Sequence, residues 1–340
     1  MRGFLLIPIT EFWFDLQLMK RIGVFCSGGD SPGMNACIRA VVRTGIALDA
    51  EVIGIRNGYQ GMLDGDFIRL NSGSVSNIIQ VGGTILKTSR CKDFLQKEGR
   101  AKAAKKLREE GIEGLICIGG DGTYTGAMLF EAEHGIPCIG CPGTIDNDLF
   151  GTDYTIGFHT AVNTAMEAID RIRDTAESHA RVFFIEVMGR HSGHLALQAG
   201  LASGAEGIFI PEKTNEMQLI VQRLKNRKRK KAFSIFIVAE GDEEGRAFEI
   251  ANEFQKSFPE TETRVSVLGY IQRGGSPVPE DRILATRLGC EAVQFLLKGG
   301  KNMAAGIIGN QIQMTPLQET IQKKKDVPLD IWAINELLSH

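Results

Sequence analysis

The 340-residue sequence has little net charge and no long, uninterrupted apolar run. A formal charge of −2 at pH 7 argues against a nucleic acid or a membrane surface bound through bulk electrostatics. The apolar stretch near residues 4–9 is too short to cross a bilayer and is soon followed by Glu11 and Asp15. We therefore expect neither a nucleic-acid partner nor a membrane partner.

Two common phosphate-binding motifs are also missing. The first glycine-rich turn reads Gly28-Gly29-x-x-x-Gly33, which is not the G-x-G-x-x-G spacing of dinucleotide-binding folds. No G-x-x-x-x-G-K-[ST] loop occurs. These absences disfavour a hydride-transfer enzyme and exclude a standard P-loop.

Other bulk features describe an ordinary globular protein. The hydrophobic fraction of 43% and charged fraction of 24% are usual, and 340 residues are enough for two cores. Seven cysteines, an odd number, suit reduced thiols in a cytoplasm better than a disulfide framework. We expect a cytoplasmic protein in which residues 1–18 form an extension without a role in the chemistry.

Apolar runs of strand length alternate with helical patterns. Strands are predicted at residues 22–26, 52–55, 114–118, 138–141, 182–187, 207–210, 233–239 and 264–268. Helices are predicted at residues 34–48, 100–110, 155–175 and 283–297. This alternation predicts α/β architecture, with parallel sheets covered by helices and ligands bound beyond the carboxyl ends of the strands.

Three acidic, glycine-rich turns lie where predicted strands should lead into helices. They are Ser27-Gly28-Gly29-Asp30, Gly119-Gly120-Asp121-Gly122-Thr123 and Pro142-Gly143-Thr144-Ile145-Asp146-Asn147-Asp148. Glycines let backbone N–H groups approach phosphate oxygens closely, and a following helix N-terminus favours negative charge. Three such turns together predict phosphoryl transfer.

The carboxylates in these turns need a role other than anion binding, because a bare carboxylate repels phosphate. Asp121 is predicted to hold Mg²⁺ in a nucleotide loop, although an Asp there can also simply cap the next helix. Asp146 and Asp148 are two residues apart, and such a pair of like charges should raise the pKa of at least one of them, which suits a general base. Their alternative is a polar turn tip in solvent.

Arginines near predicted strand ends complete the pattern, because their guanidinium groups bind phosphate bidentately. The candidates are Arg90, Arg181, Arg190, Arg264 and Arg273. By contrast, Cys138-x-x-Cys141 lies in a predicted strand, where positions i and i+3 face opposite sides. We therefore expect no metal or redox pair there.

Three more motifs occur at residues 151–158 (Gly-Thr-Asp-Tyr-Thr-Ile-Gly-Phe), 186–190 (Glu-Val-Met-Gly-Arg) and 269–277 (Gly-Tyr-Ile-Gln-Arg-Gly-Gly-Ser-Pro). With the three turns, they make the chain from about Lys20 onward resemble the ATP-dependent 6-phosphofructokinases of bacterial glycolysis. The resemblance implies Mg-ATP-dependent phosphorylation of fructose 6-phosphate at its C1 hydroxyl. It implies a homotetramer as well.

The resemblance also implies two similar three-layer α/β/α domains with mostly parallel sheets and a cleft between them. The ATP-binding domain would comprise residues 19–156 plus about 271–315. The sugar-phosphate-binding domain would comprise residues 157–270 plus the C-terminal segment from about 316 to 340.

Site roles follow from the same resemblance. ATP would contact Gly29, Arg90, Cys91, Gly120, Asp121, Gly122 and Thr123, with Asp121 on Mg²⁺. Catalysis would use Asp146 as the base, with Thr144, Asp148 and Arg190. The sugar phosphate would contact Thr144, Ile145, Asp146, Met188, Gly189, Arg190, Glu240, Tyr270 and Arg273, with Arg181 and Arg264 reaching in from a neighbouring subunit. An effector would contact Arg39, Arg43, Arg173 and Glu206.

Departures from the family pattern affect some of these roles. Tyr270 stands where the bacterial enzymes usually have His, and Ser72 stands where an effector-binding Arg is usual. Gly122 and Gly143 occupy positions that carry Asp and Lys in pyrophosphate-using relatives, which favours ATP by leaving room for the nucleotide. A pyrophosphate-dependent enzyme, a NAD kinase and a non-catalytic nucleotide-binding homologue are the alternatives.

Overall fold

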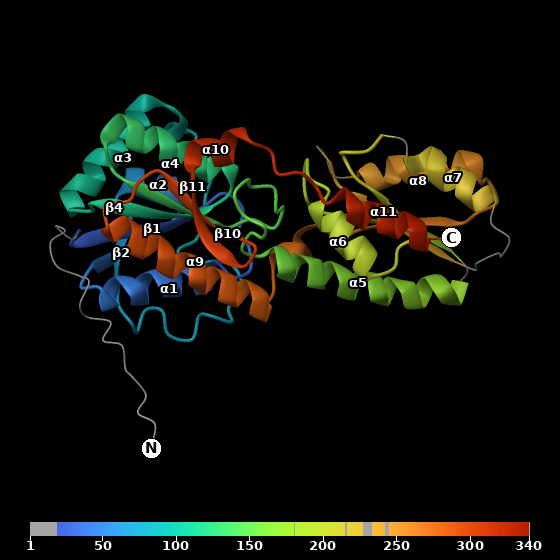
Figure 1. Cartoon of the computed structure of the whole chain (residues 1–340), viewed down its shortest axis with the longest axis horizontal. Helices are drawn as coiled ribbons and strands as arrows, with labels where there is room; N and C mark the ends of the chain where they lie inside the picture. The colour runs from blue at the N-terminus through green and yellow to red at the C-terminus, as the bar shows by residue number, and fades with distance from the viewer. Residues whose placement is uncertain (1–18, 180, 215, 227–232, 242–244, 340) are drawn as a thin grey trace, which may run out of the picture.

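The chain folds into two α/β units joined side by side (Figure 1). The computed structural model describes residues 19–179, 181–214, 216–226, 233–241 and 245–339. The predicted extension, residues 1–18, lies outside this range. Within the described part of the chain, no helix is both long and apolar enough to span a bilayer.

The first unit contains a seven-stranded sheet with the order β11-β10-β5-β4-β1-β2-β3. Its strands are β1 (Arg21–Ser27), β2 (Glu51–Ile55), β3 (Phe67–Leu70), β4 (Gly114–Gly119), β5 (Cys138–Pro142), β10 (Met303–Ile308) and β11 (Gln311–Pro316). Its five central strands run parallel, and only β3 and β11 pair antiparallel at the two edges. From β1 the chain continues to β2 and β3 on one side and then returns to β4 and β5 on the other. This reversal of the strand order creates a switch point between β1 and β4.

Helices cover both faces of this sheet. One face carries α1 (Met34–Ala47) and α9 (Pro279–Leu297); the other carries α2 (Gly58–Asp64), α3 (Lys97–Glu110), α4 (Asp121–His134) and α10 (Leu317–Gln322). Alternate strand residues point to opposite faces, so Cys138 packs in one core and Cys141 in the other. The expectation that these two side chains face opposite sides of the sheet is confirmed.

The helices α1 and α9 lie unusually close to each other. A Cβ at Gly289 of α9 would be 3.0 Å from the carbonyl oxygen of Cys37 on α1. A larger residue would therefore crowd this contact. Leu284, Leu288 and Val293 on α9 then complete the core over that face of the sheet.

The second unit has a four-stranded, fully parallel sheet with the order β7-β8-β6-β9. Its strands are β6 (Val182–Val187), β7 (Gly207–Phe209), β8 (Ser234–Ala239) and β9 (Thr263–Val267). One face carries α5 (Phe158–His179), α6 (His194–Ala202) and α11 (Leu329–Leu338), and the other carries α7 (Glu216–Lys225) and α8 (Arg246–Ser257). Each unit is thus a three-layer sandwich, as expected for the fold class.

The chain passes between the units at three places. It enters the second unit after loop 143–157, returns through the 3₁₀ helix η2 (Gly269–Arg273) into α9, and crosses again at residues 323–328. In Figure 1 the last crossing is the red segment that runs from α10 to α11. These crossings place side chains of both units around one cleft.

All eight predicted strands exist, with ends that differ by at most one residue. The hairpin of β10 and β11 and the edge strand β3 were not predicted. The helix predicted at residues 155–175 corresponds to α5, which begins at Phe158, three residues later than predicted. Residues 317–322 pack on α4 of the first unit, although we expected the chain from 316 onward to lie with the second.

Candidate active site

The three acidic turns follow three neighbouring strands of the first sheet. Ser27 of β1 is paired with Gly119 of β4, and Gly119 is paired with Pro142 of β5. The strands are parallel, so all three turns emerge at the same carboxyl edge. The structure therefore brings the three turns together beyond the carboxyl ends of the strands, as expected, and their role as one phosphate site stays a prediction.

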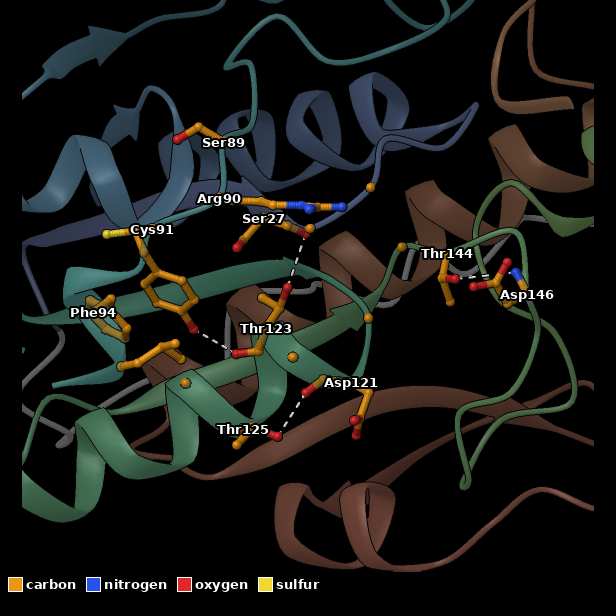
Figure 2. A pocket seen from close by; sticks show the side chains of 18 of the residues that line it. Ser27, Ser89, Arg90, Cys91, Phe94, Asp121, Thr123, Thr125, Thr144 and Asp146 are labelled. Atoms are coloured by element: carbon orange, nitrogen blue, oxygen red, sulfur yellow. Dashed lines mark hydrogen bonds between the residues drawn. The ribbon is translucent and has the colours of Figure 1, made fainter. Parts of the chain in front are cut away.

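Side chains connect the turns to each other. The Thr123 hydroxyl donates to the carbonyl oxygen of Ser27 at 3.0 Å, which ties the second turn to the first (Figure 2). The Tyr59 hydroxyl donates to the carbonyl oxygen of Thr123 at 2.6 Å. Asp121 is the first residue of α4, so the N–H groups of that helix end face the same space.

A cavity of about 570 Å³ opens at this edge. Every residue predicted to contact ATP lines it, namely Gly29, Arg90, Cys91, Gly120, Asp121, Gly122 and Thr123. The predicted catalytic residues Thr144, Asp146, Asp148 and Arg190 line it as well. The carboxylate proposed as base and the carboxylate proposed for Mg²⁺ thus share a single cavity.

Sequence reasoning missed the apolar end of this cavity. Tyr59 and Phe94 stack with ring centroids 3.8 Å apart, and Leu129 and Gly126 line the space beside them. A Cβ at Gly126 would lie 2.8 Å from the Tyr59 hydroxyl oxygen, so only glycine allows this ring position. An apolar wall beside phosphate-binding turns can take the base and sugar of a nucleotide.

Arg100 supports this end of the cavity from behind. Its guanidinium group pairs bidentately with Glu133 at 2.7 Å and donates to the carbonyl oxygens of Phe94 and Leu95 at 2.9 and 2.8 Å. Arg100 is 4% exposed, so its charge is paired inside the protein. It fixes the short helix η1 (Asp93–Leu95) that carries Phe94.

Asp146 has the properties of a general base. Its side chain is buried, and its Oδ1 atom has no hydrogen-bond partner among the described residues. Burial, with a smaller contribution from the charge of Asp148, raises the pKa of Asp146 to about 6. The pKa rise was predicted from the Asp pair, but burial is its larger cause.

The charge of Asp148 acts on the other two carboxylates of the site. Its charge raises the pKa of Asp146 and that of Asp121, although burial is the first cause in each case. Burial of the carboxyl group within the cleft also raises the pKa of Asp148 itself. All three carboxylates therefore interact electrostatically at one end of the cavity.

Loop 143–157 holds these carboxylates by internal hydrogen bonds. The Asp146 N–H donates to the Thr144 hydroxyl at 3.2 Å (Figure 2). The Thr155 hydroxyl donates to the Thr144 carbonyl at 2.6 Å. Asn147 adopts a left-handed conformation with φ 53°, and its side-chain oxygen accepts from the Thr155 N–H at 3.0 Å. Asn tolerates this conformation well. Asn147 lies between Asp146 and Asp148 in the sequence.

The second unit contributes Arg190 from the turn after β6. Arg190 has φ 51°, and its N–H donates to the Glu240 carboxylate at 3.1 Å. The N–H of Met188 donates to the side chain of Gln272 at 3.3 Å, and Gly189 has φ 140°. The structure thus brings together predicted sugar-phosphate residues from two turns. Met188, Gly189 and Arg190 follow β6, and Glu240 follows β8.

Arg273 connects the two units at the cavity. Its guanidinium group donates to the carbonyl oxygen of Asp30 at 3.1 Å. A Cβ at Gly29 would be 2.6 Å from a terminal nitrogen of Arg273. The first turn therefore needs glycine to let this arginine lie across it.

Three predicted substrate contacts lie away from the cavity within one chain. Arg181 pairs with Glu262 at 2.9 Å, and Arg264 pairs with the same carboxylate. Tyr270 is 74% exposed, and none of the three lines the cavity. Ile145, another predicted contact, is buried in the core of the second unit, so only its backbone can face a ligand.

The predicted effector residues lie in different units. Arg39 and Arg43 are on α1, Arg173 is on α5 and donates to the Ser203 carbonyl, and Glu206 precedes β7. The Glu206 carboxylate accepts from the Ile235 N–H at 2.6 Å. Within one chain these residues do not form one site, and the effector role stays a prediction.

The two glycines that favoured ATP have different structural reasons. A Cβ at Gly122 would meet nothing within 4 Å, so this glycine leaves open space in the cavity. A Cβ at Gly143 would lie 2.9 Å from Met34 Cε and 3.0 Å from Ile118 Cγ2. Gly143 is therefore closely packed against α1 and β4, and it also lines the cavity, so the interpretation that it leaves room for the nucleotide stays a prediction.

Comparisons with known proteins agree with this geometry. The Phosphofructokinase family matches residues 21–296. The ATP-dependent 6-phosphofructokinase 1 of Thermus thermophilus is 55% identical over 322 residues, which cover 94% of this chain and 100% of the relative.

Solved structures of the same family share the fold. A phosphofructokinase from Saccharomyces cerevisiae matches with a TM-score of 0.81 at 38% identity, over 89% of this chain and 45% of the yeast chain. A pyrophosphate-dependent phosphofructokinase from Marinobacter aquaeolei matches with a TM-score of 0.77 at 25% identity, over 92% of this chain and 86% of the other. The two-unit architecture, the shared cavity and these similarities together show that the chain belongs to the phosphofructokinase family.

Proposed function

We propose that this protein is an ATP-dependent 6-phosphofructokinase, which transfers the γ-phosphoryl group of ATP to the C1 hydroxyl of fructose 6-phosphate. The products are fructose 1,6-bisphosphate and ADP, and the reaction is the committed step of glycolysis. One observation carries the proposal: Asp146 and the glycine-rich turn with Asp121 line the same cavity. The 55% identity to a named ATP-dependent enzyme supports it.

Asp146 is proposed to accept the proton of the C1 hydroxyl. A buried acceptor without a partner needs a donor, and a substrate hydroxyl supplies one. A pKa of about 6 leaves the carboxylate ionised at neutral pH and still basic enough to take a proton. Thr144 and Asp148 flank this base.

The carboxylates fit Mg²⁺ better than a metal with a full protein cage. Among the described residues, no three His, Cys, Asp or Glu side chains converge on a metal position. Mg²⁺ is usually held by one or two carboxylates together with substrate phosphates and waters. We propose that Asp121 holds it, with Asp148 nearby, and that the bound ion neutralises charge on the donor phosphates.

Arginines from both units are proposed to neutralise the transferred group and hold the sugar phosphate. Arg90 lines the nucleotide side of the cavity, while Arg190 and Arg273 face it from the second unit and from η2. Phosphoryl transfer asks the protein chiefly for positioning and charge neutralisation, which this arrangement can supply. Met188, Gly189 and Glu240 would complete the sugar site.

Pyrophosphate is the competing donor. The apolar wall of Tyr59 and Phe94 favours a nucleoside over pyrophosphate, because a bare diphosphate has no apolar part to bury. The pyrophosphate-dependent relative is 25% identical, against 55% for the ATP-dependent one. Both observations support ATP.

Assembly is proposed to complete the sugar site. Arg181, Arg264 and Tyr270 lie on the β9 side of the second unit, away from the cavity of their own chain. In a homotetramer they would bind the sugar phosphate of a neighbouring subunit. We further propose that the enzyme works in the cytoplasm, in line with the seven free cysteines.

A coupled assay tests the function. We expect fructose 6-phosphate turnover with Mg-ATP to exceed turnover with Mg-pyrophosphate at equal concentration by at least about 100-fold. A fructose 6-phosphate titration without turnover would identify a non-catalytic homologue. Activity with pyrophosphate that equals or exceeds activity with ATP would overturn the donor assignment.

A further inference from the structure

The last crossing between the units runs past the catalytic loop. Residues 323–328 leave α10 on the first unit and enter α11 on the second. Residues 323–327 line a second cavity of about 710 Å³, which shares Asp121 and Asp148 with the nucleotide cavity. Lys323, Lys324 and Lys325 thus bring positive charge to the side of these carboxylates.

Lys325 is the member of this group that contacts the catalytic loop through its side chain. Its Nζ donates to the carbonyl oxygen of Asp153 at 2.6 Å. The same oxygen accepts from the side-chain amide of Asn147 at 3.2 Å. Since Asn147 lies between Asp146 and Asp148, one carbonyl oxygen links the ammonium group of Lys325 to the residue that separates the two carboxylates.

The crossing segment is itself held in place on both sides. Lys324 forms an antiparallel β-bridge with Leu149 through the backbone, and the backbone of Lys325 hydrogen-bonds the ring of His194 at the start of α6. The far part of the loop is anchored to β10, because the Asp153 N–H donates to the Ile307 carbonyl at 2.6 Å. The backbone of Lys325 is therefore held in place, and its side chain contacts a loop that is also anchored to β10.

Lys325 also interacts with the carboxylates of the site through its charge. Asp148 interacts favourably with Lys325, Arg190 and His191, and it interacts unfavourably with Asp146 and Asp121. Three carboxylates in one small region repel each other, and a nearby cation reduces the cost of keeping them ionised. Lys325 is half-buried, so its charge is screened less than that of an exposed lysine.

We propose that Lys325 is a positioning residue for the phosphoryl-transfer reaction. Its ammonium group fixes loop 143–157 through the Asp153 carbonyl and supplies a second cation, besides Arg190, beside Asp148. This role rests on the proposed function, because it acts on the carboxylates assigned to the base and to the metal side of the cavity. Both parts of the role, the hydrogen bond and the charge, are needed.

Three substitutions separate these parts. Lys325→Met removes both the charge and the donor, Lys325→Gln keeps a donor without the charge, and Lys325→Arg keeps both. Lys324→Met is the matched control, because it removes one positive charge from the exposed neighbour, whose contact with the loop is made by the backbone. Thermal unfolding of each variant shows whether its fold is retained.

We expect Lys325→Met to lower kcat by about 10-fold or more, with the KM for ATP changed by less than about threefold, because the nucleotide end of the cavity is untouched. Lys325→Gln should lose nearly as much, while Lys325→Arg and Lys324→Met should stay within about threefold of the unmodified protein. If Lys325→Met fails to fold, the comparison of the Gln and Arg variants decides.

Two results would overturn the proposal. A Lys325→Met protein with more than half of the original kcat would show that the residue does not position the site. Full activity of Lys325→Gln would show that the charge is not needed and that Lys325 is merely a structural tether. If the unmodified protein does not phosphorylate fructose 6-phosphate, the result contradicts the proposed function itself.

Discussion

The carboxylate of Asp281, on α9, accepts a hydrogen bond of 2.7 Å from the backbone N–H of Thr160, on α5. It also accepts from the Gly157 N–H at 2.9 Å and from the Thr160 hydroxyl at 2.5 Å. A residue from the helix that covers the first sheet thus caps the first helix of the second unit. Asp281 is fully buried, so no water replaces these bonds.

This cap makes Asp281 a link between the units. We expect Asp281→Ala to lower the free energy of unfolding by about 2–3 kcal/mol, because three donors lose a charged acceptor. Glu280→Ala, at the exposed neighbouring position, is the control. Urea unfolding measures both variants, and equal stabilities would contradict the assignment of Asp281 as the cap of α5.

Asp146→Asn tests the general base. We expect kcat to fall by about 10²–10⁴-fold, because an amide cannot accept the hydroxyl proton. ATP affinity should stay largely intact, since the nucleotide turns and the apolar wall are unchanged. Steady-state kinetics and an ATP titration provide the two readouts, and a variant with more than half of the original kcat would rule out Asp146 as the base.

The same substitution should stabilise the protein above neutral pH. The pKa of Asp146 is about 6 when folded against an ordinary value of 3.8, so the native state binds more protons than the unfolded state between these values. Stability from this group therefore decreases as the pH rises through that window. Ionised Asp146 costs up to about 3 kcal/mol at pH 7.5.

Asp146→Asn removes this cost. We expect a free energy of unfolding higher by about 2–3 kcal/mol at pH 7.5, and by about half as much at pH 5. Urea titrations at the two pH values give the comparison. A variant whose stability gain is the same at both would show that the group is not titrating in this window.

Gly122→Asp tests donor selection. The open space beside Gly122 accepts the side chain, and an acidic residue in the first turn of α4 is favourable for the helix, so the fold should be kept. The added carboxylate should repel the ATP phosphates and raise the KM for ATP by about 10-fold or more. Gly122→Asn, of the same size without the charge, separates repulsion from bulk. Equal KM values for the two variants would refute the electrostatic explanation.

Much of the site could be predicted because its main residues follow strands directly. Asp121 and Asp146 come after apolar runs that form β4 and β5, and parallel strands bring their carboxyl ends to one edge. The paired register of Ser27, Gly119 and Pro142 then follows from the strands alone. The relative placement of the three turns could thus be predicted from the local sequence.

The remaining parts depend on contacts between distant segments. Tyr59 and Phe94 look like ordinary core aromatics in the sequence, and only tertiary packing places them beside the nucleotide turns. Asp281 looks like a first-turn acid of its own helix but caps another. The β10–β11 hairpin did have a local signal, since Gly309-Asn310 between an apolar run and an alternating segment is typical of a two-residue turn.

The first sheet is not built from one continuous stretch of chain. Strand β5 ends at Pro142, and its outer neighbour β10 begins only at Met303. The sheet of the second unit is complete by Val267, before α9 and β10 have been synthesised. On the ribosome, where segments fold as they emerge, the first sheet keeps an open edge at β5 until β10 and β11 have been synthesised. Both units therefore depend on the end of the chain, because α11, which covers one face of the second sheet, is synthesised after β10 and β11.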